Sequence, residues 1–167
     1  MDEIIRNRFK QIFGVFGDKI LEESIREGIV RFRVGRGDYF YDVTYIYEQP
    51  LCEIKFPMGF GNENNEKLNE LFQNDEFLFE FQKLLTVPGL SYYINGEDNS
   101  VQGYSVFIRI FKNGMEIQIS EISIAVQSVL AYGMLAYSFI RLSLGKNQNG
   151  KQLVEGTQNS FENPMFR

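Results

Sequence analysis

The sequence predicts an α+β domain in which a single antiparallel sheet of about five to six strands packs against helices, in the order α-β-β-β-α-β-β-(β)-α. Two segments place apolar residues three and four positions apart, which is the spacing of one helical face. Several short segments alternate apolar and polar residues, as half-buried strands do. The chain has 167 residues, 44% of them hydrophobic, with 16 Phe and 9 Tyr. This composition predicts one domain with a substantial core.

The first helical pattern lies within residues 2–27. Its apolar positions are Ile5, Phe9, Ile12, Phe16 and Ile20. Gly17 interrupts the pattern, and a glycine inside a helix costs roughly 1 kcal/mol. We therefore expect the helix to end or bend near Gly17 and a second helical piece to run from Asp18 to Glu27.

Six runs of alternating residues predict strands. Three of them are expected to form an antiparallel meander: 29–34, 39–48 and 51–56. Three more follow in the second half of the chain: 90–95, 104–111 and 115–120. The two sets are separated by the loop 57–65, rich in Gly, Pro and Asn, and by helical spacing over 64–85. Asn74 or Asp75 can restart that helix, because both residue types are good N-caps.

The most apolar stretch, Ile122–Ile140, contains no charged residue. A bilayer requires about 20 apolar residues, so its length is borderline. Internal Gln, Ser and Tyr residues and the lack of a Lys/Arg cluster at either end disfavour a membrane span. We expect a buried helix that is covered on two sides, with Ser120 or Ser123 as its cap and Gly145 at its end.

The domain is expected to cover residues 1–145, followed by a polar C-terminal tail at 146–167 that is rich in Asn, Gln and Gly. The start of the chain lacks the pattern of a signal peptide. Cys52 is the single cysteine, so no intramolecular disulfide can form. These observations favour the cytoplasm.

Charge and residue usage exclude several kinds of site. The 17 basic and 22 acidic residues give a net charge of −5, and no basic run favours nucleic acid. The chain has no histidine. Catalytic triads, Cys-His pairs and histidine metal sites are therefore excluded, and we expect no metal site and no cofactor.

A row of tyrosines is the least ordinary feature of the predicted sheet. Tyr39, Tyr41, Tyr45 and Tyr47 lie on one face of the run 39–48. Tyrosine is enriched where proteins meet, so this row could be a protein-binding surface, with Arg31 and Arg33 stacked against it. The row could equally be the core face of the sheet, and the sequence leaves both alternatives open.

A group of carboxylates, Asp75, Glu76 and Glu80, lies within about one turn of the second helical segment. Such groups can perform acid–base chemistry or bind a hard cation. Acids at a helix start are explained more simply by the helix dipole, and we favour that interpretation.

The order of elements, with the strand runs 29–34, 39–48 and 51–56 flanked by the helical segments 2–27 and 64–85, resembles the type III secretion chaperone-like fold, including its YbjN-type members. The resemblance covers about residues 1–145. It implies a small acidic homodimer that binds other polypeptides through exposed apolar grooves and catalyses nothing.

From the residues and this resemblance we expect a non-enzymatic protein-binding or chaperone-like module that forms a homodimer. An alternative is a small-ligand-binding protein or an enzyme that uses carboxylate, Lys or Tyr groups near the loop 57–65. The sequence does not name the polypeptide partner.

Overall fold

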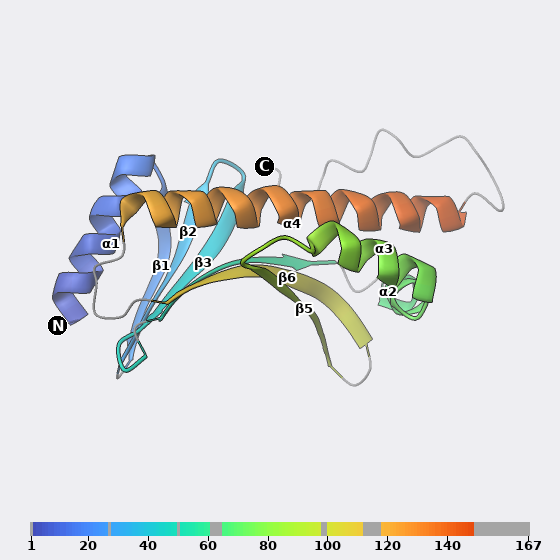
Figure 1. Cartoon of the computed structure of the whole chain (residues 1–167), viewed down its shortest axis with the longest axis horizontal. Helices are drawn as coiled ribbons and strands as arrows, with labels where there is room; N and C mark the ends of the chain where they lie inside the picture. Colours follow the sequence, from blue (N-terminus) through green and yellow to red (C-terminus); the bar gives the residue numbers. More distant parts are fainter. Residues whose placement is uncertain are drawn as a thin grey trace. The chain divides into compact units, whose positions relative to one another are not determined.

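The computed structural model describes residues 2–26, 28–49, 51–60, 65–97, 100–111 and 118–148. Its elements are α1 (Asp2–Phe16), β1 (Lys19–Arg26), β2 (Ile29–Arg36), β3 (Tyr39–Ile46), β4 (Leu51–Gly59), α2 (Asn65–Phe72), α3 (Asp75–Leu85), β5 (Leu90–Glu97), β6 (Ser100–Phe111) and α4 (Ile119–Gln148). The strands form a six-stranded antiparallel sheet in the order β1-β2-β3-β4-β6-β5. The predicted α+β fold class is confirmed (Figure 1).

The chain divides into two compact units. Unit 1 consists of Met1–Phe56 and Phe107–Leu130, and unit 2 consists of Pro57–Val106 and Ala131–Arg167. β4, β6 and α4 each contribute residues to both units.

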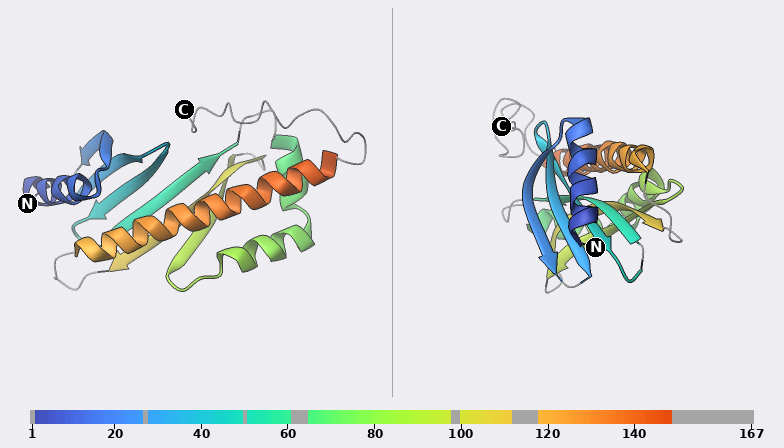
Figure 2. Two further views of the ribbon diagram at one scale, coloured as in Figure 1. Left: turned by 90° about the horizontal axis from the view of Figure 1, so that it is seen from above. Right: turned by 90° about the vertical axis from the view of Figure 1, so that its left-hand side faces the viewer.

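In unit 1, α1 packs on one face of β1 and β2 (Figures 1 and 2). The ring of Phe9 lies 5.7 Å from the ring of Phe32, and the ring of Phe13 lies 5.3 Å from it, measured between centroids. Both helix residues and Phe32 are buried. Phe9, which was predicted on the first helical face, and Phe13, which was not, therefore anchor α1 on the sheet.

The predicted second helical piece, from Asp18 to Glu27, is wrong, because β1 covers Lys19–Arg26. Gly17 adopts a φ of 71° and the N–H of Asp18 donates to the carbonyl of Phe13, which together end α1. A bulge between Ile20 and Glu22 then places Ile20 and Glu23 on the same face of the strand. The bulge interrupts the two-residue alternation by which a strand is recognised in the sequence.

In unit 2, α2 and α3 are two helices separated by a short break. Asn74 caps α3, since its side-chain oxygen accepts a hydrogen bond from the N–H of Phe77 at 2.9 Å. The predicted restart at Asn74 is thus confirmed. The ring of Phe81 packs edge-on against Tyr92 and Tyr104 at 5.5 and 5.9 Å.

The hydroxyl of Tyr104 donates to the carbonyl of Gly133 in α4 at 2.5 Å, and the tyrosine is fully buried. This bond joins the core of unit 2 to the C-terminal part of α4. Pro57–Gly59 belong to β4, the half-buried Phe60 stacks on Tyr137 at 5.5 Å, and Asn65 begins α2. The predicted loop 57–65 is therefore wrong for most of its described residues. Residues 61–64 lie outside the described residues.

α4 is longer than predicted at both ends. The Glu121 carboxylate accepts from the N–H of Gln118, so the helix begins there and the predicted caps Ser120 and Ser123 are wrong. The helix also continues past Gly145. Of the predicted strand 115–120, residues 115–117 lie outside the described residues, as do 149–167 of the predicted tail.

α4 contains a stretch, Ile119–Gly145, that is long and apolar enough to cross a bilayer, and 39% of its most apolar window is buried. Core helices of soluble proteins meet the same criterion. Ile122 and Val126 are buried in unit 1, and Ala136 and Ile140 are buried in unit 2. The helix thus contributes to the cores of both units. The predicted cover on two sides is incomplete, because Ile124, Leu135 and Leu142 are 65%, 49% and 66% exposed.

Candidate functional site

The predicted tyrosine row lies on the core face of the sheet. Tyr41 is fully buried, and its ring lies 6.4 Å from that of Phe13 in α1. The ring of Tyr45 lies 5.9 Å from that of Phe9. Tyr39 and Tyr47 are half-buried. Burial therefore favours the core alternative that the sequence left open.

Arg31 and Arg33 lie on the opposite face of the sheet from the tyrosines. Arg33 pairs with Asp42 in the strand register and Arg31 pairs with Thr44, whereas Val34 pairs with Tyr41. The two arginines therefore do not stack on the tyrosine row, contrary to our expectation. Arg33 instead stacks over Phe40, its guanidinium carbon 5.0 Å from the ring centroid.

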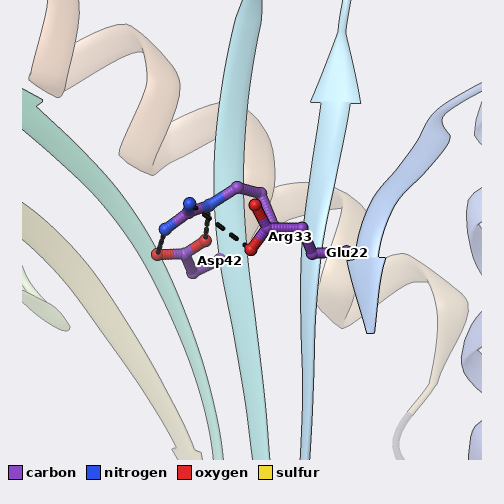
Figure 3. A network of polar contacts seen from close by, with 3 residues as sticks. All are labelled: Glu22, Arg33 and Asp42. Carbon is purple, nitrogen blue, oxygen red and sulfur yellow. Dashed lines mark hydrogen bonds and ion pairs between the residues drawn. The ribbon is translucent and has the colours of Figure 1, made fainter. Parts of the chain in front are cut away.

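Ion pairs connect neighbouring strands on this second face (Figure 3). Arg33 donates from Nε to the Asp42 carboxylate at 2.9 Å and approaches Glu22 on β1 at 3.5 Å. The hydrogen bond to Asp42 raises the pKa of Arg33. Arg109 on β6 donates to Glu53 on β4 at 2.8 Å. These contacts are the cross-strand pairs expected on the solvated face of an antiparallel sheet.

The same face carries a hollow of unit 1 with a volume of about 580 Å³. Its lining is mainly charged or hydroxylic and includes both predicted arginines. Because the lining contains side chains of both charges, the hollow offers no single class of ligand a strong preference.

A second hollow of about 480 Å³ in unit 1 surrounds an ion pair between Asp18 and Arg36. Arg36 donates to both carboxylate oxygens at 2.7 Å, and the hydroxyl of Tyr41 donates to the same carboxylate at 2.6 Å. Burial, followed by the neighbouring Asp18, raises the pKa of Tyr41. The carboxylate is only 1% exposed. Since its charge is neutralised within the fold, we interpret this network as structural.

The third hollow, of about 340 Å³, lies between α3 and α4 within unit 2. Its floor is apolar, because the rings of Phe77 and Phe139 stack with centroids 5.2 Å apart. Its rim is acidic, with Glu70, Glu76 and Glu80. Glu80 forms a surface pair with Lys83 at 3.5 Å.

Leu135 and Leu142 extend this apolar floor along α4. They lie four residues before and three residues after Phe139, so all three share one helical face. Leu142 is 66% exposed and Leu135 is 49% exposed. We name the set formed by Phe77, Leu135, Phe139 and Leu142 the α3–α4 surface.

From the sequence, Glu76 and Glu80 were interpreted as helix-start acids, and Glu70 was not singled out. These three acids line one hollow with Phe139 only because the fold brings α2 and α3 next to α4, which is far away in the chain. One feature of the sequence could have indicated this site. In the second helical segment, acids directly precede the apolar positions Leu71 and Phe77.

The pKa of Cys52 is also strongly raised, because its thiol is fully buried. Among the residues that the structure describes, no three His, Cys, Asp or Glu side chains gather as metal ligands.

Comparison with known proteins identifies relatives of the fold. No protein-family model matches the chain. No curated protein matches its sequence. The crystal structure of an uncharacterized protein from Methanothermobacter thermautotrophicus superposes with a TM-score of 0.67 at 16% identity, covering 86% of this chain and 98% of the archaeal one. The likeness concerns the fold alone.

The crystal structure of YbjN from E. coli also matches, with a TM-score of 0.48 at 8% identity, covering 89% of this chain and 95% of YbjN. YbjN, whose type the sequence resemblance named, is therefore among the structural neighbours. Structural similarity at this level carries no argument about function.

Proposed function

We propose that this protein is a non-enzymatic polypeptide-binding module of the cytoplasm, acts as a homodimer, and holds a basic amphipathic segment of its partner on the α3–α4 surface. The observation that carries the proposal is the exposure of Leu135 and Leu142 beside the stacked Phe77 and Phe139. A chaperone-like role, as in the family that the sequence resembles, would use such a surface.

The apolar side chains support a helical partner. Leu135, Phe139 and Leu142 lie four and then three residues apart, which is the spacing that an amphipathic helix meets with its own apolar face. Contiguous exposed apolar side chains rimmed by polar ones mark interaction sites. A volume of about 340 Å³ in the adjoining hollow accommodates a large apolar side chain.

The acidic rim supports a basic partner. Glu70, Glu76 and Glu80 border the hollow, and the net charge of the whole chain is −5. Lys or Arg residues flanking the apolar face of the partner would complement these carboxylates and accelerate association. Nucleic acid is disfavoured by the same charges.

We propose a non-enzymatic role because the tyrosines with strongly shifted pKa values are buried. The tyrosines with the largest pKa shifts, Tyr41 and Tyr104, are both buried and hydrogen-bonded. Burial is the first cause of both shifts, and it keeps these hydroxyls protonated. They serve packing rather than proton transfer.

The test uses two synthetic amphipathic peptides, one composed of Leu and Lys and the other of Leu and Glu. Binding to the full chain is measured by fluorescence anisotropy at low and high salt. We expect the Leu/Lys peptide to bind and the Leu/Glu peptide not to bind. Leu142→Ser should weaken binding about tenfold, because an exposed leucine buried on binding contributes roughly 1.5 kcal/mol.

Ile4→Ser on α1 is the matched control, since Ile4 is 74% exposed and lies in unit 1. Glu76→Gln should reduce binding two- to threefold at low salt and have less effect at high salt, whereas the control Glu3→Gln should have none. Equal loss in Leu142→Ser and Ile4→Ser, or equal affinity for both peptides, would contradict the proposal.

A further inference from the structure

The two edges of the six-stranded sheet differ in how they are protected. The sheet order places β1 at one edge and β5 at the other. An edge strand presents unpaired N–H and C=O groups that can pair with another chain. Charged side chains, bulges and prolines are the usual devices that prevent such pairing.

β1 carries these devices. Its sequence KILEESIR contains Lys19, Glu22, Glu23 and Arg26, and a bulge interrupts its register with β2. Lys10 and Arg6 of α1 form ion pairs with Glu23. This edge is therefore guarded by charge and by irregular geometry.

The sequence of β5 supplies neither proline nor internal charge. Its sequence LSYYINGE has no proline, and its first charged residue is the last one, Glu97. Tyr93 and Ile94 remain 43% and 38% exposed. Among the strands that the structure describes, none lies on the outer side of β5. This edge offers backbone hydrogen-bonding groups together with apolar side chains.

We propose that β5 pairs antiparallel with β5 of a second copy about a two-fold axis at Tyr93. This inference rests on the homodimer of the proposed function and names its interface. In this register, Tyr93 faces the partner's Tyr93 and Tyr92 faces the partner's Ile94, and Ser91 faces the partner's Asn95.

The register is self-complementary, as an isologous interface requires. Aromatic–aromatic and aromatic–β-branched pairs are among the favourable cross-strand pairs, and the polar Ser–Asn pair completes the row. Neighbouring registers about a two-fold axis are less complementary, because an axis at Tyr92 places Ser91 opposite Tyr93 and leaves Ile94 opposite Leu90 at the end of the strand.

Side chains on both faces of β5 already contact neighbouring elements. A further strand would therefore pair along the outer edge of β5. The ring of Tyr92 packs against Phe81 of α3 at 5.5 Å. On the other face, the amide of Asn95 donates to the hydroxyl of Ser105 on β6 at 3.2 Å. A partner strand can therefore be added without displacing these contacts.

The test begins with sedimentation velocity of the full chain over a range of micromolar concentrations, where a dimer is expected. Ile94→Lys should then weaken dimerisation at least about 30-fold, because it brings a charge into the centre of the interface. The matched control is Ile25→Lys on the other edge strand, where Ile25 is 43% exposed. Circular dichroism and thermal unfolding establish that both variants fold.

A second variant tests the register. Tyr93→Cys places two cysteines opposite each other across the axis, so mild oxidation should give a cross-linked dimer. Ile25→Cys should give none, and the native Cys52 is buried and should not react.

The outcomes separate the two proposals. A wild-type monomer would overturn both the homodimer and this interface. A wild-type dimer that survives Ile94→Lys and does not cross-link through Tyr93→Cys would overturn the β5 pairing and leave the homodimer standing.

Discussion

Replacing Asp18 by Asn tests whether the ion pair at the end of α1 holds unit 1 together. The carboxylate accepts three hydrogen bonds, at 2.7, 2.7 and 2.6 Å, from Arg36 and Tyr41. Removing one partner of a buried pair costs about 3–5 kcal/mol. Because Arg36 is 27% exposed and can regain water, we expect the low end of this range, about 3 kcal/mol.

The matched control is Asp42→Asn, which removes a carboxylate paired with Arg33 on the solvated face of the same sheet. Arg33 is 39% exposed and Asp42 is 20% exposed. We expect a cost of no more than about 1 kcal/mol, as for other accessible ion pairs. The assay is urea unfolding followed by circular dichroism, with the free energies of unfolding compared at one pH and salt concentration.

A double-mutant cycle with Tyr41→Phe then isolates the hydroxyl. A hydrogen bond to a charged group contributes about 1.5–3 kcal/mol, so the two substitutions should be non-additive by at least about 1 kcal/mol. If Asp18→Asn destabilises the protein no more than Asp42→Asn does, the structural role assigned to Asp18 is refuted.

Three further predictions concern titration and reactivity. Tyr41 and Tyr104 should stay protonated in the folded protein above the ordinary pKa of tyrosine, since burial raises their pKa values. Tyrosinate absorbance, with which no Trp absorbance overlaps in this chain, would show these two residues ionising only on unfolding. The stability that these two groups contribute is present below about pH 10 and is lost as the pH rises above it. Cys52 should react with a thiol reagent only after urea unfolds the protein, and reaction at the rate of a free thiol without urea would contradict its burial. Burial raises the pKa of Glu23, but hydrogen bonds from Lys10 and a second cation of α1 outweigh it and lower the pKa below its ordinary 4.5. Glu23→Gln should therefore destabilise the protein by about 0.5 kcal/mol at neutral pH, a difference that should disappear as the pH falls through the lowered pKa, as urea unfolding at several pH values would show.

Local patterns in the sequence were sufficient for most elements of the fold. The alternation in β2, β3 and β4 and the apolar spacing in α1 report burial directly, because each depends on side chains of one segment. The helical interpretation of Asp18–Glu27 failed because a bulge in β1 interrupts the two-residue alternation typical of a strand. A bulge is defined by the pairing of β1 with β2, so the pattern of residues along β1 alone does not reveal it.

The sites were less predictable because they depend on which faces meet. Both faces of β3 carry apolar residues, and only the packing of Phe9 and Phe13 from α1 decides that the tyrosine side is the core. The hollow in unit 2 joins Phe77 and Phe139, which are distant in the chain. No spacing in the sequence reports such a contact.

The two proposals in unit 2 combine into one expectation about avidity. Pairing of β5 with its copy would present the α3–α4 surface twice in one particle, because a two-fold axis repeats every surface of the chain. A partner with two basic amphipathic segments joined by a flexible linker that spans the two surfaces would then bind through both, with the second contact made at high effective concentration.

We expect a tandem Leu/Lys peptide to bind the wild-type protein at least about tenfold more tightly than a single peptide does. Ile94→Lys should remove this advantage and leave the affinity for the single peptide unchanged, whereas Leu142→Ser should weaken both. Anisotropy titrations of the two peptides against the three proteins distinguish these patterns, and an avidity gain that survives the loss of the dimer would show that both segments bind one copy of the chain.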